Sequence, residues 1–446
     1  MSQYKWRLAA LLLLLGGAVP PAAAQEALSL SMKEAVELAI APDGATGIRL
    51  AREAVRQAES RRGQARAALL PQVDSYVQYD DRTTNLKAFG IDVQIPGAPF
   101  ALPEKAGPFN VFDARAQAGQ TIFNYSAIKR FQAAGAAVKA AGARHDGART
   151  LVASQVAKAY LAALRSEARL EAAEANVALA EELLKLAENQ KAAGTGTGID
   201  ITRANVQLSN ERQALLVANN ARRRAHFELL RAMDLKLSVD LDLSDRLVYH
   251  PTDIQAAETA LETALASRPD WQARRLQEES ARQSHTSVKW ERLPTVAAFG
   301  NYGVIGNGVN GSFPTRAYGV RLSVPVFDGG RMEARRAETA SAYRQERIET
   351  ADLRGQIELE VRLSLDALSS AREQVEVARD GLALAENELA QAQRRFRAGV
   401  ASGLEVTDAQ NRLARARDNQ IAALFNYESA RLDLGQAMGT ILDMAR

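Results

Sequence analysis

The chain has 446 residues, enough for roughly two or three domains. Its 56 Lys and Arg residues nearly balance its 53 Asp and Glu residues, so it lacks the basic surplus typical of nucleic-acid binding. The absence of cysteine excludes disulfides, thiol catalysis, thiolate metal sites and a lipid anchor on a cysteine. Aromatic residues make up only 6% and alanine is abundant, a composition typical of long, closely packed helices.

Residues 1–24 have the three regions of a secretory signal peptide. Lys5 and Arg7 form the basic region, an apolar run follows at 8–15, and small residues at 22–24 form a cleavage site. The alternative is a membrane anchor, but the run is far shorter than the ~20 apolar residues of a spanning helix. We therefore expect cleavage after Ala24 and an exported, nearly neutral mature protein.

Internal repetition covers nearly the whole mature chain. Residues 193–202 (AGTGTGIDIT) align with 398–407 (AGVASGLEVT) at a spacing of 205, and the Leu-Pro pair at 70–71 recurs at 293–294. Self-similarity at a long fixed spacing indicates a duplicated structural unit. We predict repeat 1 at 25–234, a linker at 235–253 and repeat 2 at 254–446.

Each repeat has the pattern helix, strand, strand, very long helix, tight turn, helix. The long segments contain no proline, and at 1.5 Å per residue each would form a rod of about 100 Å. In repeat 1 we predict strands at 72–82 and 111–123, a long helix at 125–193 and a tip turn at 194–198. In repeat 2 we predict strands at 295–304 and 315–327, a long helix at 329–398 and a tip turn at 399–403.

Heptads run along both long helices. A large apolar residue recurs every seven positions, as at Val156 and Val361, and a small residue follows three positions later, as at Ala159 and Ser364. One large and one small position form a seam along which helix axes approach closely. Taken alone, the heptads would also fit a soluble coiled-coil rod.

The predicted strands alternate between apolar and polar residues. Tyr318, Val320 and Leu322 point one way, and Gly319 and Arg321 point the other. Such alternation fits either a membrane β-barrel around water or a soluble half-buried sheet. The signal peptide and aromatic residues near the strand ends favour the membrane. Four strands are too few to enclose a lumen, which takes about eight, whereas three copies would supply twelve.

Three ordered sets of residues carry a resemblance to a known family: 395–399 (RFRAG) followed by 404–406 (LEV), 266–270 (ASRPD) and 325–330 (PVFDGG). From about residue 28 to residue 438 the chain closely resembles the TolC-like outer-membrane efflux channels, also called outer membrane factors. The resemblance implies a mostly α-helical fold with membrane β-structure. Three copies would form a 12-stranded β-barrel in the outer membrane of a Gram-negative-type bacterium, continued by a long periplasmic α-helical barrel. The linker would lie in an equatorial band.

The same resemblance implies the function and the partners. The homotrimer would be the passive exit duct of a tripartite efflux or type I secretion system. It would sit in outer-membrane lipid and work with a periplasmic adaptor and an inner-membrane transporter. The adaptor would dock at the tip turns, around Gly194, Gly399 and Val400. No cofactor or metal is implied.

The family closes its periplasmic tip with polar contacts, and by position the acidic residues there are Asp200, Glu405 and Asp408. This chain has Phe396 and Ala401 where a gating tyrosine and a gating arginine can stand. Arg203 lies on the same helical face as Asp200. We predict that Arg203 bridges to the Glu405 and Asp408 carboxylates. The alternative is that these are solvated charges on an exposed helix face.

Other signals indicate no enzyme. The glycine-rich residues 194–198 follow a helix and lack the Gly-Lys-Ser/Thr ending of a phosphate loop, so a helical-hairpin turn is favoured. The histidines have no ligand-like spacing, and no catalytic constellation is evident. The competing interpretation is a soluble periplasmic coiled-coil scaffold or adaptor, which would leave the paired strands of both repeats without a role.

Overall fold

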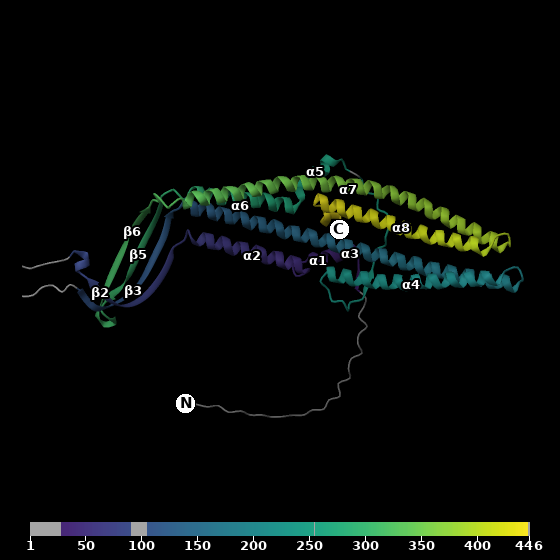
Figure 1. The fold of residues 1–446 in the computed structure, drawn as a ribbon, viewed down its shortest axis with the longest axis horizontal. Coiled ribbons are helices and arrows are strands. Elements are labelled where there is room, and N and C mark those ends of the chain that lie inside the picture. The colour runs from purple at the N-terminus through teal and green to yellow at the C-terminus, as the bar shows by residue number, and fades with distance from the viewer. Residues whose placement is uncertain (1–27, 91–104, 254, 445–446) are drawn as a thin grey trace, which may run out of the picture.

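The computed structural model describes residues 28–90, 105–253 and 255–444. They form an elongated molecule with a sheet at one end and two helical-hairpin tips at the other (Figure 1). The helices are α1 (Met32–Ile40), α2 (Thr46–Ala67), α3 (Tyr125–Ala192), α4 (Gly198–Ala232), α5 (Ala257–Ser267), α6 (Pro269–Lys289), α7 (Arg331–Arg397), α8 (Gly403–Met438) and α9 (Ile441–Met444). The strands are β1 (Leu28–Leu30), β2 (Gln72–Asn85), β3 (Lys105–Phe123), β4 (Leu241–Leu243), β5 (Thr295–Gly306) and β6 (Ser312–Ser323).

The element order repeats within the chain. The series α1, α2, β2, β3, α3, α4 is followed by α5, α6, β5, β6, α7, α8, and the two long helices have 68 and 67 residues. Short 3₁₀ turns at Lys87–Phe89 and Val309–Gly311 follow the first strand of each pair. Helix α3 begins at a capping Asn124, whose side chain accepts a hydrogen bond from the Ala127 N–H.

Several element bounds differ from those predicted. Strand β6 ends at Ser323, four residues before the predicted end, because Pro325 has no N–H to donate to a ladder. Helix α7 begins at Arg331 and not at residue 329, because Gly329 and Gly330 have φ of +70° and +87°. Strands β2 and β3 are longer than predicted and extend to Asn85 and back to Lys105.

The four long strands form one antiparallel sheet in the order β2-β3-β5-β6. Directly opposite residues of neighbouring strands share a face, and the register places Ala116 opposite Tyr302 and Tyr302 opposite Arg316. Strands β2 and β6 are the edges, each paired on one side only within the chain. The short strands β1 and β4 form a separate parallel pair.

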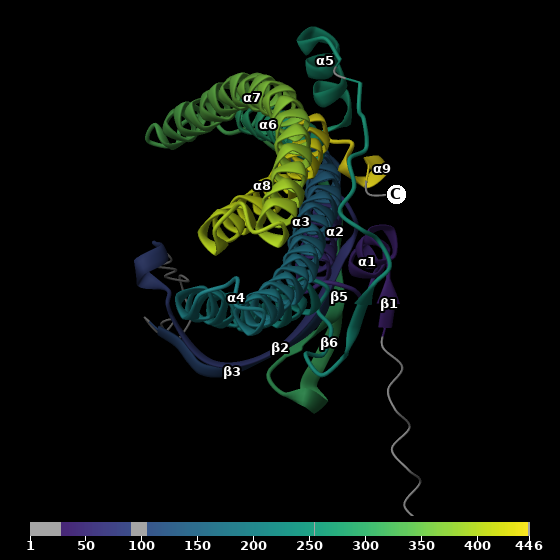
Figure 2. The ribbon, with the colours of Figure 1, turned by 90° about the vertical axis from the view of Figure 1, so that its right-hand side faces the viewer.

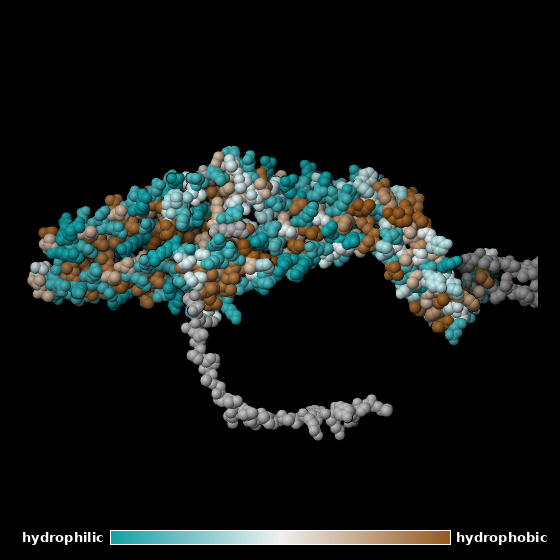
Figure 3. Space-filling view, turned by 180° about the vertical axis from the view of Figure 1, so that it is seen from behind, coloured by the Kyte–Doolittle hydropathy of each residue, from teal (hydrophilic) through white to brown (hydrophobic). Residues whose placement is uncertain are grey.

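The helices lie along an arc and do not surround a closed core, as the end view shows (Figure 2). Helix α3 packs against α4, α8, α2 and α6, whereas α7 packs against α8, α6 and α5. The heptad positions lie at these contacts. Val156 and Val361, from the large position of the heptad, are buried, and so are Ala180 and Ala385, from the small position. Apolar residues gather over the sheet end and in strips along the helices (Figure 3).

None of the described helices is both long enough and apolar enough to cross a membrane.

Candidate functional site

The two tip turns have the same backbone design. Gly194 and Gly399 have φ of +74° and +73°, a left-handed conformation that favours glycine. Just beyond each glycine, an N–H reaches back to the last helical turn: Thr195 donates to the Gln190 carbonyl at 3.0 Å and Val400 to the Arg395 carbonyl at 3.1 Å. These bonds satisfy helix-end carbonyls and turn the chain sharply into the next helix.

Asp200 belongs to a capping box at the start of α4. Its Oδ2 accepts hydrogen bonds from the Thr197 N–H, at 3.2 Å, and from the Thr197 hydroxyl. It also lies beside the second tip, because a Cβ added to Gly403 would be 3.0 Å from Asp200 Oδ1. The first predicted acidic residue therefore stabilises its own turn and lies where the starts of α4 and α8 meet.

The other two predicted acidic residues pair with arginines of their own hairpin. Glu405 Oε1 is 3.2 Å from Arg395 Nε, and Asp408 binds Arg412, which also contacts Glu388 at 2.5 Å. Arg203 is exposed and makes no ion pair within the described part of the chain. One chain by itself therefore does not bring Arg203 to these carboxylates, and a bridge to the acids of another copy stays a prediction.

Phe396 is part of the core of the tip. It is 4% exposed and packs in an apolar cluster with Leu389, Val406 and Leu413, among others. Its backbone carbonyl accepts a hydrogen bond of 2.8 Å from Gln190 Nε2 of the other hairpin. At this position the aromatic ring therefore stabilises the tip by packing, while the polar contact between the hairpins comes from Gln190.

Polar residues that the sequence did not single out join the two hairpins above the tip. Gln207 Nε2 on α4 donates to Asn411 Oδ1 on α8 at 3.1 Å, and the buried Gln410 donates to the Leu179 carbonyl at 3.2 Å. Farther along, Arg417 Nη1 lies 2.7 Å from Asn176 Oδ1. The sequence signal for Gln207 and Gln410 is weak: each is an amide side chain close to a small residue, Ala204 or Ala409.

The linker forms a strap over the middle of the rod. Asp245 Oδ2 accepts the Met32 N–H at 2.7 Å and lies 2.9 Å from the hydroxyl of the buried Tyr160, and burial and Asp245 raise the pKa of that hydroxyl. Farther along, Glu428, with a side chain 7% exposed, holds His250 at 3.2 Å and Arg431 at 2.8 Å.

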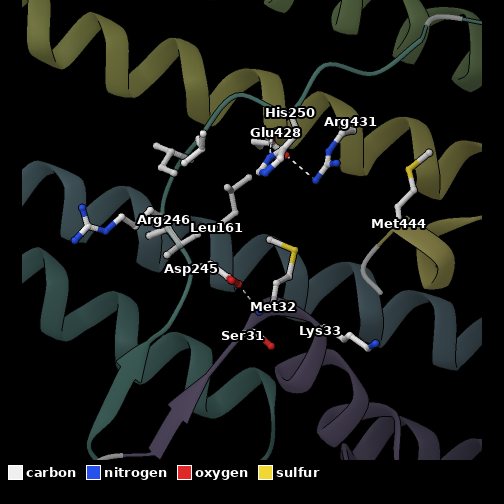
Figure 4. A pocket seen from close by; sticks show the side chains of 13 residues that line it. Ser31, Met32, Lys33, Leu161, Asp245, Arg246, His250, Glu428, Arg431 and Met444 are labelled. Atoms are coloured by element: carbon white, nitrogen blue, oxygen red, sulfur yellow. Dashed lines mark hydrogen bonds and ion pairs between the residues drawn. The ribbon is translucent and has the colours of Figure 1, made fainter.

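A cavity of about 420 Å³ lies between these two fastenings (Figure 4). Tyr427 adds to the second fastening, because its hydroxyl donates to the His250 carbonyl at 2.9 Å and accepts the Thr252 N–H at 3.1 Å. The strap therefore ties the start of α1 to α8. No group of side chains in the described residues has the arrangement of a metal site.

The open sheet, the arc of long helices and the paired tips together define a duplicated, mostly helical fold with a sheet at one end. The chain belongs to the outer membrane efflux protein family, whose model matches residues 44–234 and 260–440. These two stretches fall within the two repeats.

Curated relatives are similar over much of the chain. The alkaline protease secretion protein AprF of Pseudomonas aeruginosa is 23% identical over 70% of this chain and 66% of its own length. The outer membrane efflux protein BepC of Brucella suis is 27% identical over 60% of the chain and 59% of its length. TolC of Vibrio cholerae is 22% identical over 84% of each. The chain thus spans about six tenths to two thirds of the length of the first two relatives.

Solved outer-membrane channels have the same fold. CmeC of Campylobacter jejuni superimposes with a TM-score of 0.78 at 16% identity over 92% of this chain and 86% of that one. VceC of Vibrio cholerae gives 0.77 at 17% identity over 92% and 96%.

Proposed function

We propose that three copies of this chain close into one passive duct through the outer membrane and periplasm, the exit of a tripartite efflux or type I secretion system. The observation that carries this proposal is the incomplete second repeat. Helix α3 contacts α6 and α8 of the other repeat, and β3 pairs with β5. Among the residues that the structure describes, their counterparts α7 and β6 have no such neighbours on the outer side. There α2, α4 and β2 of another copy would fit. Head-to-tail contacts of this kind close into rings.

Three copies suit the size of the sheet. Four strands from one chain cannot enclose a lumen, because about eight are needed merely to surround side chains. Twelve strands would surround water, lined by the polar face of the sheet, on which Asp74, Asp113 and Arg115 lie. The apolar face, with Val77 and Val320, would meet lipid.

The tips supply the proposed gate and the docking surface. In a ring, Glu405 and Asp408 would be repeated by symmetry, and mutually repelling carboxylates need a cation to stay together. Arg203, exposed and unpaired within the described part of the chain, is our candidate for that cation. Val400 is 68% exposed at the end of the second tip and, with Gly194 and Gly399, would meet a periplasmic adaptor coupled to an inner-membrane transporter.

Single-channel recording tests the duct directly. The mature protein would be reconstituted in a planar bilayer, and subunits would be counted by crosslinking. We expect a trimer with a discrete, cation-selective conductance, because narrow acidic rings attract cations. A soluble monomer or dimer without conductance would instead support a periplasmic scaffold or adaptor.

A further inference from the structure

Two charged residues lie on the mainly apolar face of the sheet, one on each free edge. Asp81 follows Val77 and Tyr79 on the outward face of β2, and Arg316 precedes Tyr318 on the same face of β6. Both side chains are exposed. Neither makes a hydrogen bond or ion pair with any other residue that the structure describes. A lone charge facing lipid is costly, so each of them calls for a partner.

The internal repeat fixes how two copies would align at these edges. Adding 223 to residues of β2 and 204 to residues of β3 converts the β2–β3 register into the β5–β6 register. The pair Gln72↔Gly119 becomes Thr295↔Ser323, and Val77↔Ala114 becomes Gly300↔Tyr318, both of which are observed. The two hairpins of the sheet are therefore in register with one another.

The same shifts convert the central β3–β5 pairing into the pairing of β6 with β2 of a neighbouring subunit. Ala114↔Val304 becomes Tyr318 opposite Asp81, and Ala116↔Tyr302 becomes Val320 opposite Tyr79. Arg316 is two residues from Tyr318 on the same face, so it is diagonal to Asp81. Diagonal neighbours are about 7–8 Å apart, within reach of an arginine side chain.

We infer that Arg316 forms an ion pair with Asp81 of the neighbouring subunit and that this pair disfavours a slip that separates the two residues. The inference rests on the proposed ring of three copies. In the correct register the two charges neutralise each other on the lipid face. Arg316 lies opposite residue 83 in this register, and a slip by two residues that places it opposite Asn85 would separate it from Asp81 and leave both charges unpaired on the lipid face. On the separate chain, the same charges protect the free edges from indiscriminate strand pairing.

Charge reversal with rescue tests the pair. Arg316→Asp alone and Asp81→Arg alone would place like charges together, and we expect each to lower the yield of sodium dodecyl sulfate-resistant trimer by at least roughly tenfold. The double variant Arg316→Asp/Asp81→Arg would restore the pair with its signs exchanged and recover most of that yield. Arg321→Asp, on the opposite face of β6, is the matched control and should not be rescued by Asp81→Arg.

Cysteine pairs test the register separately, since the chain has no cysteine of its own. Val320→Cys with Tyr79→Cys should crosslink subunits, whereas Leu322→Cys with Tyr79→Cys, which reports the slip that separates Arg316 from Asp81, should crosslink far less. Failure of the unaltered protein to form trimers would refute the proposed function. Trimers that ignore the charge reversals, or that crosslink in the slipped register, would refute the ion pair while leaving the duct intact.

Discussion

Replacing Leu363 of α7 by glutamine should weaken assembly of the proposed trimer. In repeat 1 the corresponding residue is Lys158, whose Nζ lies 2.5 Å from Asp433 on α8. Leu363 occupies the equivalent position on the free flank of α7 and is 58% exposed. If α4 of a neighbouring copy lies there as α8 lies on α3, Leu363 would face Glu228 and its surroundings, among them Phe227, which is 49% exposed.

The magnitude follows from the area to be covered. Full burial of a leucine contributes about 1.5–3 kcal/mol, so covering the exposed part of Leu363 would contribute about 1 kcal/mol per seam. A closed trimer has three such seams, and a polar replacement would therefore cost about 3–4 kcal/mol per trimer. That cost corresponds to more than roughly a hundredfold change in the trimer dissociation equilibrium.

Native mass spectrometry over a dilution series in detergent would measure this change. Leu151→Gln is the matched control, because Leu151 is an exposed leucine (50%) on α3, whose repeat counterpart on α7 is already Gln356. We expect the control to assemble like the unaltered protein. If both variants dissociate alike, or if neither does, α7 is not covered as the internal repeat predicts.

Four further outcomes are expected. Arg203→Glu should raise single-channel conductance in planar bilayers, because the tip acids lose their proposed cation; unchanged conductance would exclude that role. Phe396→Ala should cost about 3–5 kcal/mol in the tip core and speed amide exchange in residues 389–413, with little change at the sheet. Tyr427→Phe removes the two hydrogen bonds between the Tyr427 hydroxyl and the strap, and it should speed amide exchange in residues 249–252 only. Burial, together with nearby Arg336, lowers the pKa of His285, so the folded state disfavours its protonation. Stability should therefore fall as pH drops below the ordinary histidine value of about 6.5, and His285→Gln should flatten that dependence in thermal melts.

The duplication made the helical part of the fold readable from sequence. Two copies of one pattern constrain each other, so the heptads at Val156 and Val361 and the turns at Gly194 and Gly399 could be placed without knowledge of tertiary structure. The end of β6 was predicted too far along, because alternation continues through Val324 and Val326 although Pro325 cannot join a ladder. Val326 is in fact 92% exposed, beyond the strand.

The site was harder to predict than the fold. The Thr197–Asp200 capping box was present in the sequence as a Thr-x-x-Asp pattern, and it assigns Asp200 a local role that the family comparison did not suggest. The pairings of Glu405 with Arg395 and of Asp408 with Arg412 depend on the rotamers of long, exposed side chains. Sequence spacing allows several partners for each such charge, and the energy differences between them are small.

The contact between α3 and α8 within the chain differs in chemistry from the free flank of α7, which would contact a neighbouring copy. Within the chain, α3 meets α8 through polar pairs, Ser154 with Gln436 at 2.6 Å and Lys158 with Asp433, as well as through apolar contacts that include Leu432. The flank of α7 that corresponds to this side of α3 carries exposed apolar side chains: Leu359, Leu363, Val377 and Leu384.

Covalent linkage explains why part of the inner seam, between α3 and α8, can be polar. Tethered helices meet at high effective concentration, so contacts with little net energy are sufficient between them. Separate copies lose translational and rotational freedom when they associate, and apolar burial must offset that loss. The duplicated halves are therefore alike in fold but not interchangeable. The polar contacts of the inner seam should respond to salt, whereas the seam between subunits should depend little on salt and hold the ring together.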